Sequence, residues 1–140
     1  MCLAGVTGAA LALLQDKEER AYFVAAAEKY YVYGMKGYSD DGYCSEGVGY
    51  YNYGFCSFIL LREEICRATK GKIDFFRTPK FARIAQYGKK IQIMNQVCPA
   101  YADCRAGVQL LMKKNMKYPV WIIFHCTPSA CSPIRLGKWK

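Results

Sequence analysis

Apolar side chains recur every three to four residues as far as Tyr87, and this spacing constrains the fold more than any other feature of the chain. The period matches one face of an α-helix and differs from the alternation expected of a half-buried strand. The spacing predicts helices over residues 1–14, 16–33, 50–69 and 79–87. We therefore predict an all-α protein of antiparallel helices.

Local signals mark the ends of these helices. Asp16 followed by Glu19 has the form of a capping box, and Pro79 suits the first turn of a helix. Gly34 is expected to break the second helix. The predicted inward face of the first helix comprises Leu3, Val6, Ala10, Leu13 and Leu14. The predicted inward face of the second comprises Tyr22, Phe23, Ala26, Ala27, Tyr30 and Tyr31.

The apolar start of the chain resembles a signal peptide in composition only. Residues 1–14 lack the basic beginning of a signal peptide, and their apolar run is too short to cross a bilayer. We expect a packed helix there, and no transmembrane segment.

Charge is distributed unevenly along the chain. The net charge is +9, but residues 1–66 carry five basic and nine acidic side chains, a net charge of −4. The remaining 15 basic and two acidic side chains give residues 67–140 a net charge of +13. Such asymmetry suits a polyanion partner or a basic tail. The lysines and arginines beyond residue 105 follow no docking motif, so no specific nucleic-acid partner is predicted.

The eight cysteines include no Cys-x-x-Cys pair, which finger and ribbon metal sites use to close a tetrahedron. We expect most of them to be buried thiols, because free cysteine behaves as a small hydrophobe. No metal or cofactor is predicted. The chain's one histidine, His125, is expected to be structural or solvent-exposed.

The segment from Asp41 to Gly54 is the strongest candidate for chemistry. It holds four glycines and four tyrosines, together with Glu46 and Asn52. Glycines let the backbone approach a ligand closely, and tyrosine rings offer flat faces that suit sugars. The same tyrosines could instead be amphipathic core residues, and Glu46 could be a first-turn acid favoured by the helix dipole.

The residues of this segment resemble the heparinase II/III-like polysaccharide lyases and their alginate-lyase relatives. The most specific part is Asp-Gly-Tyr-x-x-Glu-Gly-x-x-Tyr, from Asp41 to Tyr50. Shorter matches follow in the same order along the chain. They are Cys2–Gly5, Gly71–Asp74, Pro79–Lys80, Arg83–Ala85 and Tyr101–Cys104.

The resemblance implies an α/α toroid whose cleft binds an acidic, uronate-containing polysaccharide and cleaves it by β-elimination. In such lyases a tyrosine transfers a proton, and Tyr50 is the candidate here, with Tyr51 as the fallback. Glu46 would position the loop or a sugar hydroxyl. Further substrate contacts are expected from Tyr43, Asn52 and Tyr53. Relatives of this kind are exported or periplasmic.

The chain also departs from the family. The asparagine that neutralises the uronate lies, in the family, just before the segment that Cys2 begins, so we expect an incomplete toroid over residues 1–104. Residues 105–140 are predicted to form an irregular basic tail, in which residues 118–124 favour a strand. We expect the chain to be inactive alone and to self-associate through exposed helix faces. Two alternatives are a non-catalytic binder of acidic polysaccharide and a basic nucleic-acid or membrane-surface binder.

Overall fold

The protein is described by a computed structural model that covers residues 2–74, 76–94 and 97–106. Four helices form this part of the chain: α1 (Cys2–Leu13), α2 (Lys17–Met35), α3 (Val48–Ala68) and α4 (Pro79–Lys90). Within these ranges the only β structure is two isolated bridges, Tyr38 with Cys44 and Met94 with Val97. The all-α prediction is therefore confirmed for the described residues.

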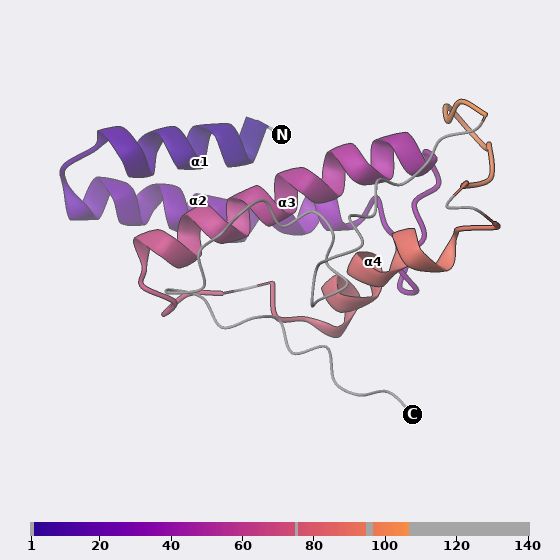
Figure 1. Cartoon of the computed structure of the whole chain (residues 1–140). Helices are drawn as coiled ribbons and strands as arrows, with labels where there is room; N and C mark the ends of the chain where they lie inside the picture. The colour runs from indigo at the N-terminus through magenta and orange to yellow at the C-terminus, as the bar shows by residue number, and fades with distance from the viewer. Residues whose placement is uncertain (1, 75, 95–96, 107–140) are drawn as a thin grey trace.

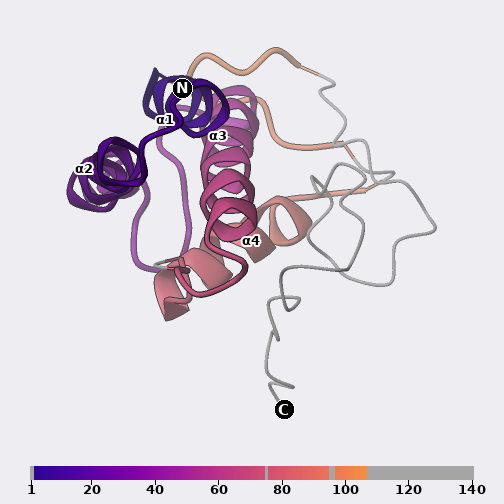
Figure 2. The same cartoon turned by 90° about the vertical axis from the view of Figure 1, so that its left-hand side faces the viewer.

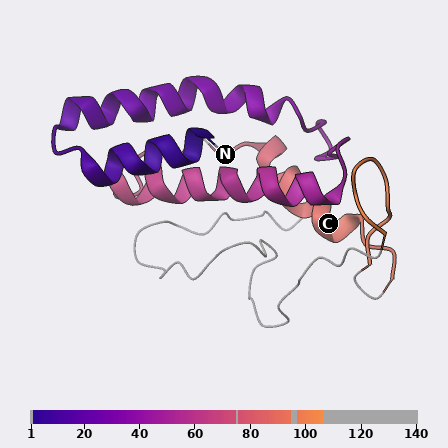
Figure 3. The ribbon, with the colours of Figure 1, turned by 90° about the horizontal axis from the view of Figure 1, so that it is seen from above.

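The first three helices lie side by side, and α2 runs antiparallel to α1 and α3 (Figures 1 and 3). Helix α1 contacts both α2 and α3. Helix α4 packs on α3, on the side away from α1 (Figures 1 and 2). The antiparallel arrangement of α1 with α2 and of α2 with α3 agrees with the expectation from the sequence.

The starts of α2 and α4 follow the local signals, whereas α3 begins at Val48, two residues before its predicted start. The Asp16 carboxylate accepts hydrogen bonds from the amides of Glu18 at 2.7 Å and Glu19 at 2.9 Å, satisfying two donors that have no partner within the helix. Thr78 caps α4 by accepting from the Phe81 amide at 3.2 Å. Two helix ends were predicted too early: α2 continues through Gly34 to Met35, and α4 ends at Lys90.

The predicted inward face of α1 is wrong at two of its largest side chains. Val6 and Leu13 are exposed, and Leu13 keeps 76% of its surface accessible. Ala10 of the predicted face is buried, and the helix also buries Ala4 and Thr7. Small side chains allow α1 to approach α3 closely. A Cβ atom placed on Gly8 would lie only 2.5 Å from Oε1 of Glu64.

The predicted face of α2 needs a similar correction. Tyr22 and Tyr30 are exposed, whereas Ala27 of the predicted face is buried together with Val24 and Met35. Tyr31 packs against the core, with its ring centroid 4.9 Å from that of Phe76, whereas Tyr22 and Tyr30 lie outside the helix contacts. A tyrosine can lie on the surface because its hydroxyl is satisfied by water while its ring covers neighbouring carbon atoms.

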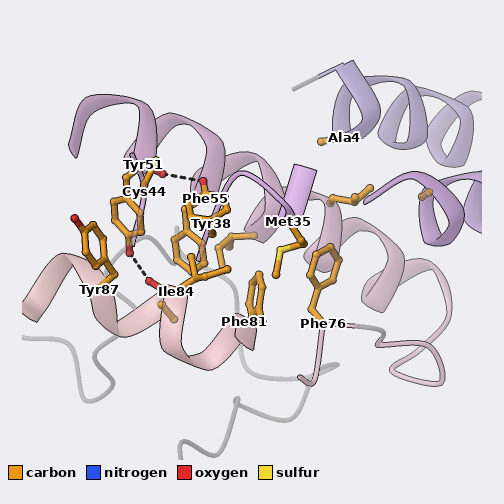
Figure 4. Close-up of a cluster of buried hydrophobic side chains, with 14 of the residues drawn as sticks. Ala4, Met35, Tyr38, Cys44, Tyr51, Phe55, Phe76, Phe81, Ile84 and Tyr87 are labelled. Atoms are coloured by element: carbon orange, nitrogen blue, oxygen red, sulfur yellow. Dashed lines mark hydrogen bonds between the residues drawn. The ribbon is translucent and has the colours of Figure 1, made fainter. Parts of the chain in front are cut away.

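Aromatic side chains form most of the core between α3 and α4 (Figure 4). Phe55 of α3 stacks on Tyr51, with ring centroids 5.6 Å apart, and packs on Phe81 of α4 at 5.3 Å. Phe76 extends this cluster to the loop before α4, 5.0 Å from Phe81. Ring pairs at such distances are stabilised by more than their buried area alone.

A buried ion pair fixes the loop between α3 and α4. Arg62 is 5% exposed and donates to both carboxylate oxygens of Asp74, from Nη2 at 2.6 Å and from Nε at 3.1 Å. The exposed Arg77 donates to the same carboxylate at 3.0 Å. The loop is therefore held to the C-terminal third of α3 by a two-point contact.

No helix in the described ranges combines the length and apolarity needed to cross a membrane. The predicted strand over 118–124, His125 and all of the predicted tail beyond residue 106 lie outside the described residues.

Candidate functional site

The glycine-rich loop between α2 and α3 is shaped by two glycines in the left-handed region. Gly42 and Gly47 both have φ of 95°, which L-residues with a side chain rarely adopt. At Gly42 the loop also touches α4, because a Cβ there would lie 2.6 Å from the Arg83 carbonyl oxygen. Both the positive φ and the close contact with α4 therefore favour glycine at position 42 of the Asp-Gly-Tyr sequence.

Asp41 stabilises the turn that contains Gly42. Its carboxylate accepts hydrogen bonds from the Ser39 hydroxyl and, at 3.1 Å, from the Tyr43 amide. These two bonds, the Ser39 hydroxyl foremost, hold the pKa of Asp41 below its ordinary value. Asp41 is therefore occupied in ordering the loop.

A tyrosine cluster supports the loop from its other side. Tyr101 donates a hydrogen bond to the Cys44 carbonyl at 2.8 Å, and its hydroxyl lies 2.7 Å from that of Tyr87. Tyr43 stacks on Tyr101 with centroids 5.7 Å apart. Burial is the main cause of the raised pKa of both Tyr87 and Tyr101. The cluster connects the loop to α4 and to residues 97–104, and it holds Cys44 in place.

An open groove of about 460 Å³ lies where the loop meets α1, α2 and α3, and we call it the tyrosine groove. It contains three of the predicted site residues, Glu46, Tyr50 and Tyr53. Tyr50 is 50% exposed and Tyr53 54%. The other lining residues are Leu3, Ala4, Tyr33, Gly34, Gly37, Tyr38, Cys44, Gly54, Ser57, Phe58 and Leu61.

The remaining predicted site residues lie elsewhere. Tyr51 is 2% exposed and forms part of the core, where its hydroxyl donates to the Ile84 carbonyl at 2.8 Å (Figure 4). Burial raises the pKa of Tyr51 far above its ordinary value. Tyr43 belongs to the cluster with Tyr87 and Tyr101, and the half-buried Asn52 does not line the groove.

Two groove residues were missed by the sequence analysis. Tyr33, which is 59% exposed, reaches the groove from α2, and Tyr38 lies beneath α3. The Tyr38 hydroxyl would be 2.5 Å from a Cβ on Gly54, so this glycine makes room for the ring. Tyr33 belongs to α2 and lies outside the segment from Asp41 to Gly54, so no signal within that segment indicates it.

The groove offers aromatic faces, hydroxyl groups and one carboxylate. Among the described residues that line it, Glu46 is the only charged side chain. The described residues hold no group of three or more histidine, cysteine or acidic side chains able to bind a metal ion. Tyrosine rings can stack on a ligand while the hydroxyls and Glu46 exchange hydrogen bonds with it.

Comparison of the chain with protein-family models, with curated proteins and with solved structures gives no significant match.

Proposed function

We propose that the tyrosine groove binds a polysaccharide, in the manner of the substrate cleft of the lyases that the sequence resembles. The observation that carries this proposal is the grouping of the exposed rings of Tyr33, Tyr50 and Tyr53 around one open groove. Aromatic faces pack against the C–H faces of sugar rings, and tyrosine hydroxyls bond to sugar hydroxyls. Glu46 is placed to accept further hydrogen bonds from the ligand.

We propose that this chain alone binds the polysaccharide but does not cleave it. The lyases that the sequence resembles need a group that neutralises the uronate carboxylate and a base that takes the C5 proton. They also need a tyrosine that transfers a proton. Tyr50 is the candidate for the tyrosine, because the hydroxyl of Tyr51 is already bonded to Ile84. The described lining of the groove includes no lysine, arginine, histidine or asparagine to neutralise a carboxylate.

Calorimetric titration with a size-defined oligouronate tests the binding proposal. Tyr50→Ala and Tyr53→Ala are each expected to weaken binding by roughly two- to tenfold, the range for loss of one aromatic contact. Tyr22→Ala is the matched control, since Tyr22 is exposed on α2 outside the tyrosine groove. Equal affinities for wild type and all three variants would show that the groove is not the binding site.

Ultraviolet absorbance tests the absence of cleavage. β-Elimination produces an unsaturated uronide that absorbs, so we expect a flat trace with heparin, heparan sulfate, alginate and hyaluronan. A rise in absorbance that Tyr50→Phe abolishes would contradict our proposal and identify Tyr50 as a catalytic residue.

The wider architecture is also a proposal. We propose that α1 to α4 correspond to part of an α/α toroid, supported by the antiparallel order of α1, α2 and α3.

The exposed Val6, Leu13 and Tyr22 border an apolar groove of about 560 Å³ between α1 and α2. We propose self-association through this surface, and Leu13→Glu is expected to shift the protein toward monomer in sedimentation analysis.

The alternative of a nucleic-acid or membrane-surface binder stays a prediction. It depends on the basic half of the chain, residues 67–140, of which residues 107–140 lie outside the described part.

A further inference from the structure

We propose that the outer surface of α2 extends the tyrosine groove into a second binding region, specific for the anionic groups of a saccharide chain. This region, called here the α2 strip, consists of Lys29, Tyr30, Tyr33 and Lys36. The inference rests on the proposed polysaccharide binding and adds the origin of selectivity for acidic sugars.

The α2 strip is continuous with the groove through Tyr33, which belongs to both. Tyr30 lies one helical turn earlier, with its ring centroid 6.3 Å from that of Tyr33 and the ring planes 34° apart. Both rings are more than half exposed. A saccharide bound in the groove therefore meets a second aromatic surface if its next units follow α2.

Cations lie directly beside these rings. The Lys29 ammonium is 5.5 Å from the centroid of Tyr30, and the Lys36 ammonium is 5.0 Å from that of Tyr33. Within the described residues, neither lysine forms an ion pair. The ring quadrupoles attract the ammonium groups, and their flexible four-carbon stems allow them to turn toward a ligand.

The charges explain why the α2 strip, rather than the groove, would select an acidic sugar. Glu46 is the charged side chain of the described groove lining, and it repels a carboxylate. Lys29 and Lys36 supply two positive charges next to stacking surfaces. A uronate whose ring packs on Tyr30 or Tyr33 brings its carboxylate within reach of one of these ammonium groups.

The test uses the full chain, the double variant Lys29→Gln/Lys36→Gln, and two hexasaccharides, one of mannuronate and one neutral. Wild type is expected to bind the mannuronate more tightly, with an affinity that falls as salt is added. The double variant is expected to lose about three- to tenfold in affinity for the mannuronate, in line with two exposed ion pairs. Its affinity for the neutral hexasaccharide should not change.

The matched control removes the same charge elsewhere. Lys17→Gln/Lys72→Gln alters exposed lysines at the start of α2 and beyond the end of α3, outside the tyrosine groove. We expect this control to bind the mannuronate as wild type does. An equal loss in both double variants would overturn the α2 strip and indicate a general effect of net charge.

Other outcomes separate the two proposals. If Tyr50→Ala weakens binding but Lys29→Gln/Lys36→Gln does not, the α2 strip is wrong and the groove proposal stands. If wild type binds neither hexasaccharide, both proposals fail. If single-stranded DNA of equal charge binds as tightly as the mannuronate and the lysine variant loses both, the α2 strip is a general polyanion surface, and saccharide selectivity is refuted.

Discussion

The Tyr51 hydroxyl of α3 donates a 2.8 Å hydrogen bond to the Ile84 carbonyl of α4, four residues before the helix reaches Gly88. The Gly88 amide in turn lies 3.4 Å from the same hydroxyl. The contact places a phenol between two backbone groups of α4 at the centre of the core (Figure 4). Its neighbour Tyr50 lines the groove and is half exposed, so the two adjacent tyrosines lie in different surroundings.

Tyr51→Phe is expected to lower the free energy of unfolding by about 1 kcal/mol, because it removes a buried hydrogen bond and leaves the ring in place. Tyr50→Phe should leave stability unchanged, since its half-exposed hydroxyl has no hydrogen-bond partner among the described residues. Urea denaturation of both variants measures the difference. Equal stabilities would show that the bond to Ile84 contributes nothing.

The starts of α2 and α4 could be predicted from the sequence because local chemistry determines them. Asp16 and Pro79 act within one turn, and the structure has α2 and α4 beginning beside them. The inward face of α1 could not be predicted in this way. Leucine is more hydrophobic than alanine, but the close approach of α1 to α3 at Gly8 favours small residues there. Burial was therefore decided by helix packing rather than by side-chain hydrophobicity.

The candidate site could be predicted in part. Glu46, Tyr50 and Tyr53 share one short segment, and they lie together in the groove. Tyr33 comes from another helix, so only the fold could place it beside them. The separation of Tyr50 from Tyr51 follows from the helical period, because Tyr51 and Phe55 are four residues apart on the buried face.

Gly42→Ala is expected to destabilise the protein by more than about 1 kcal/mol, through positive φ and contact with α4. The added Cβ would lie 2.6 Å from the Arg83 carbonyl oxygen, which is backbone and cannot rotate away. Gly49→Ala serves as the control, because a Cβ there meets no atom within 4 Å. Thermal denaturation followed by circular dichroism compares them, and similar midpoints would contradict the described contact of the loop with α4.

Asp74→Ala is expected to cost about 3 kcal/mol, because it leaves the buried guanidinium of Arg62 without its bidentate partner. Arg77→Ala removes a donor from the same carboxylate at an exposed position, and its expected cost is below about 1 kcal/mol. The pair of variants therefore distinguishes burial from ion pairing as such. Comparable losses in chemical denaturation would refute this distinction.

We expect Glu64 to make the stability of the α1–α3 contact depend on pH. Its Oε1 points toward Gly8 of α1, and its Oε2 is buried without a hydrogen-bond partner. Burial raises the pKa of this carboxyl above the ordinary value of 4.5. The protonated form is thus favoured in the folded state. Its stabilising contribution is complete below the ordinary pKa and is lost as the pH rises through the raised folded value.

Glu64→Gln keeps the neutral form at every pH, so it is expected to be more stable than wild type at about pH 8, by about 1 kcal/mol, with little difference at about pH 4. Thermal midpoints at both pH values measure the effect, which corresponds to roughly 4 °C. Glu46→Gln is the control, because Glu46 is exposed and forms no ion pair within the described residues. Destabilisation by Glu64→Gln at both pH values would mean that the ionised carboxylate is stabilised in the folded protein, the reverse of the effect inferred from its burial.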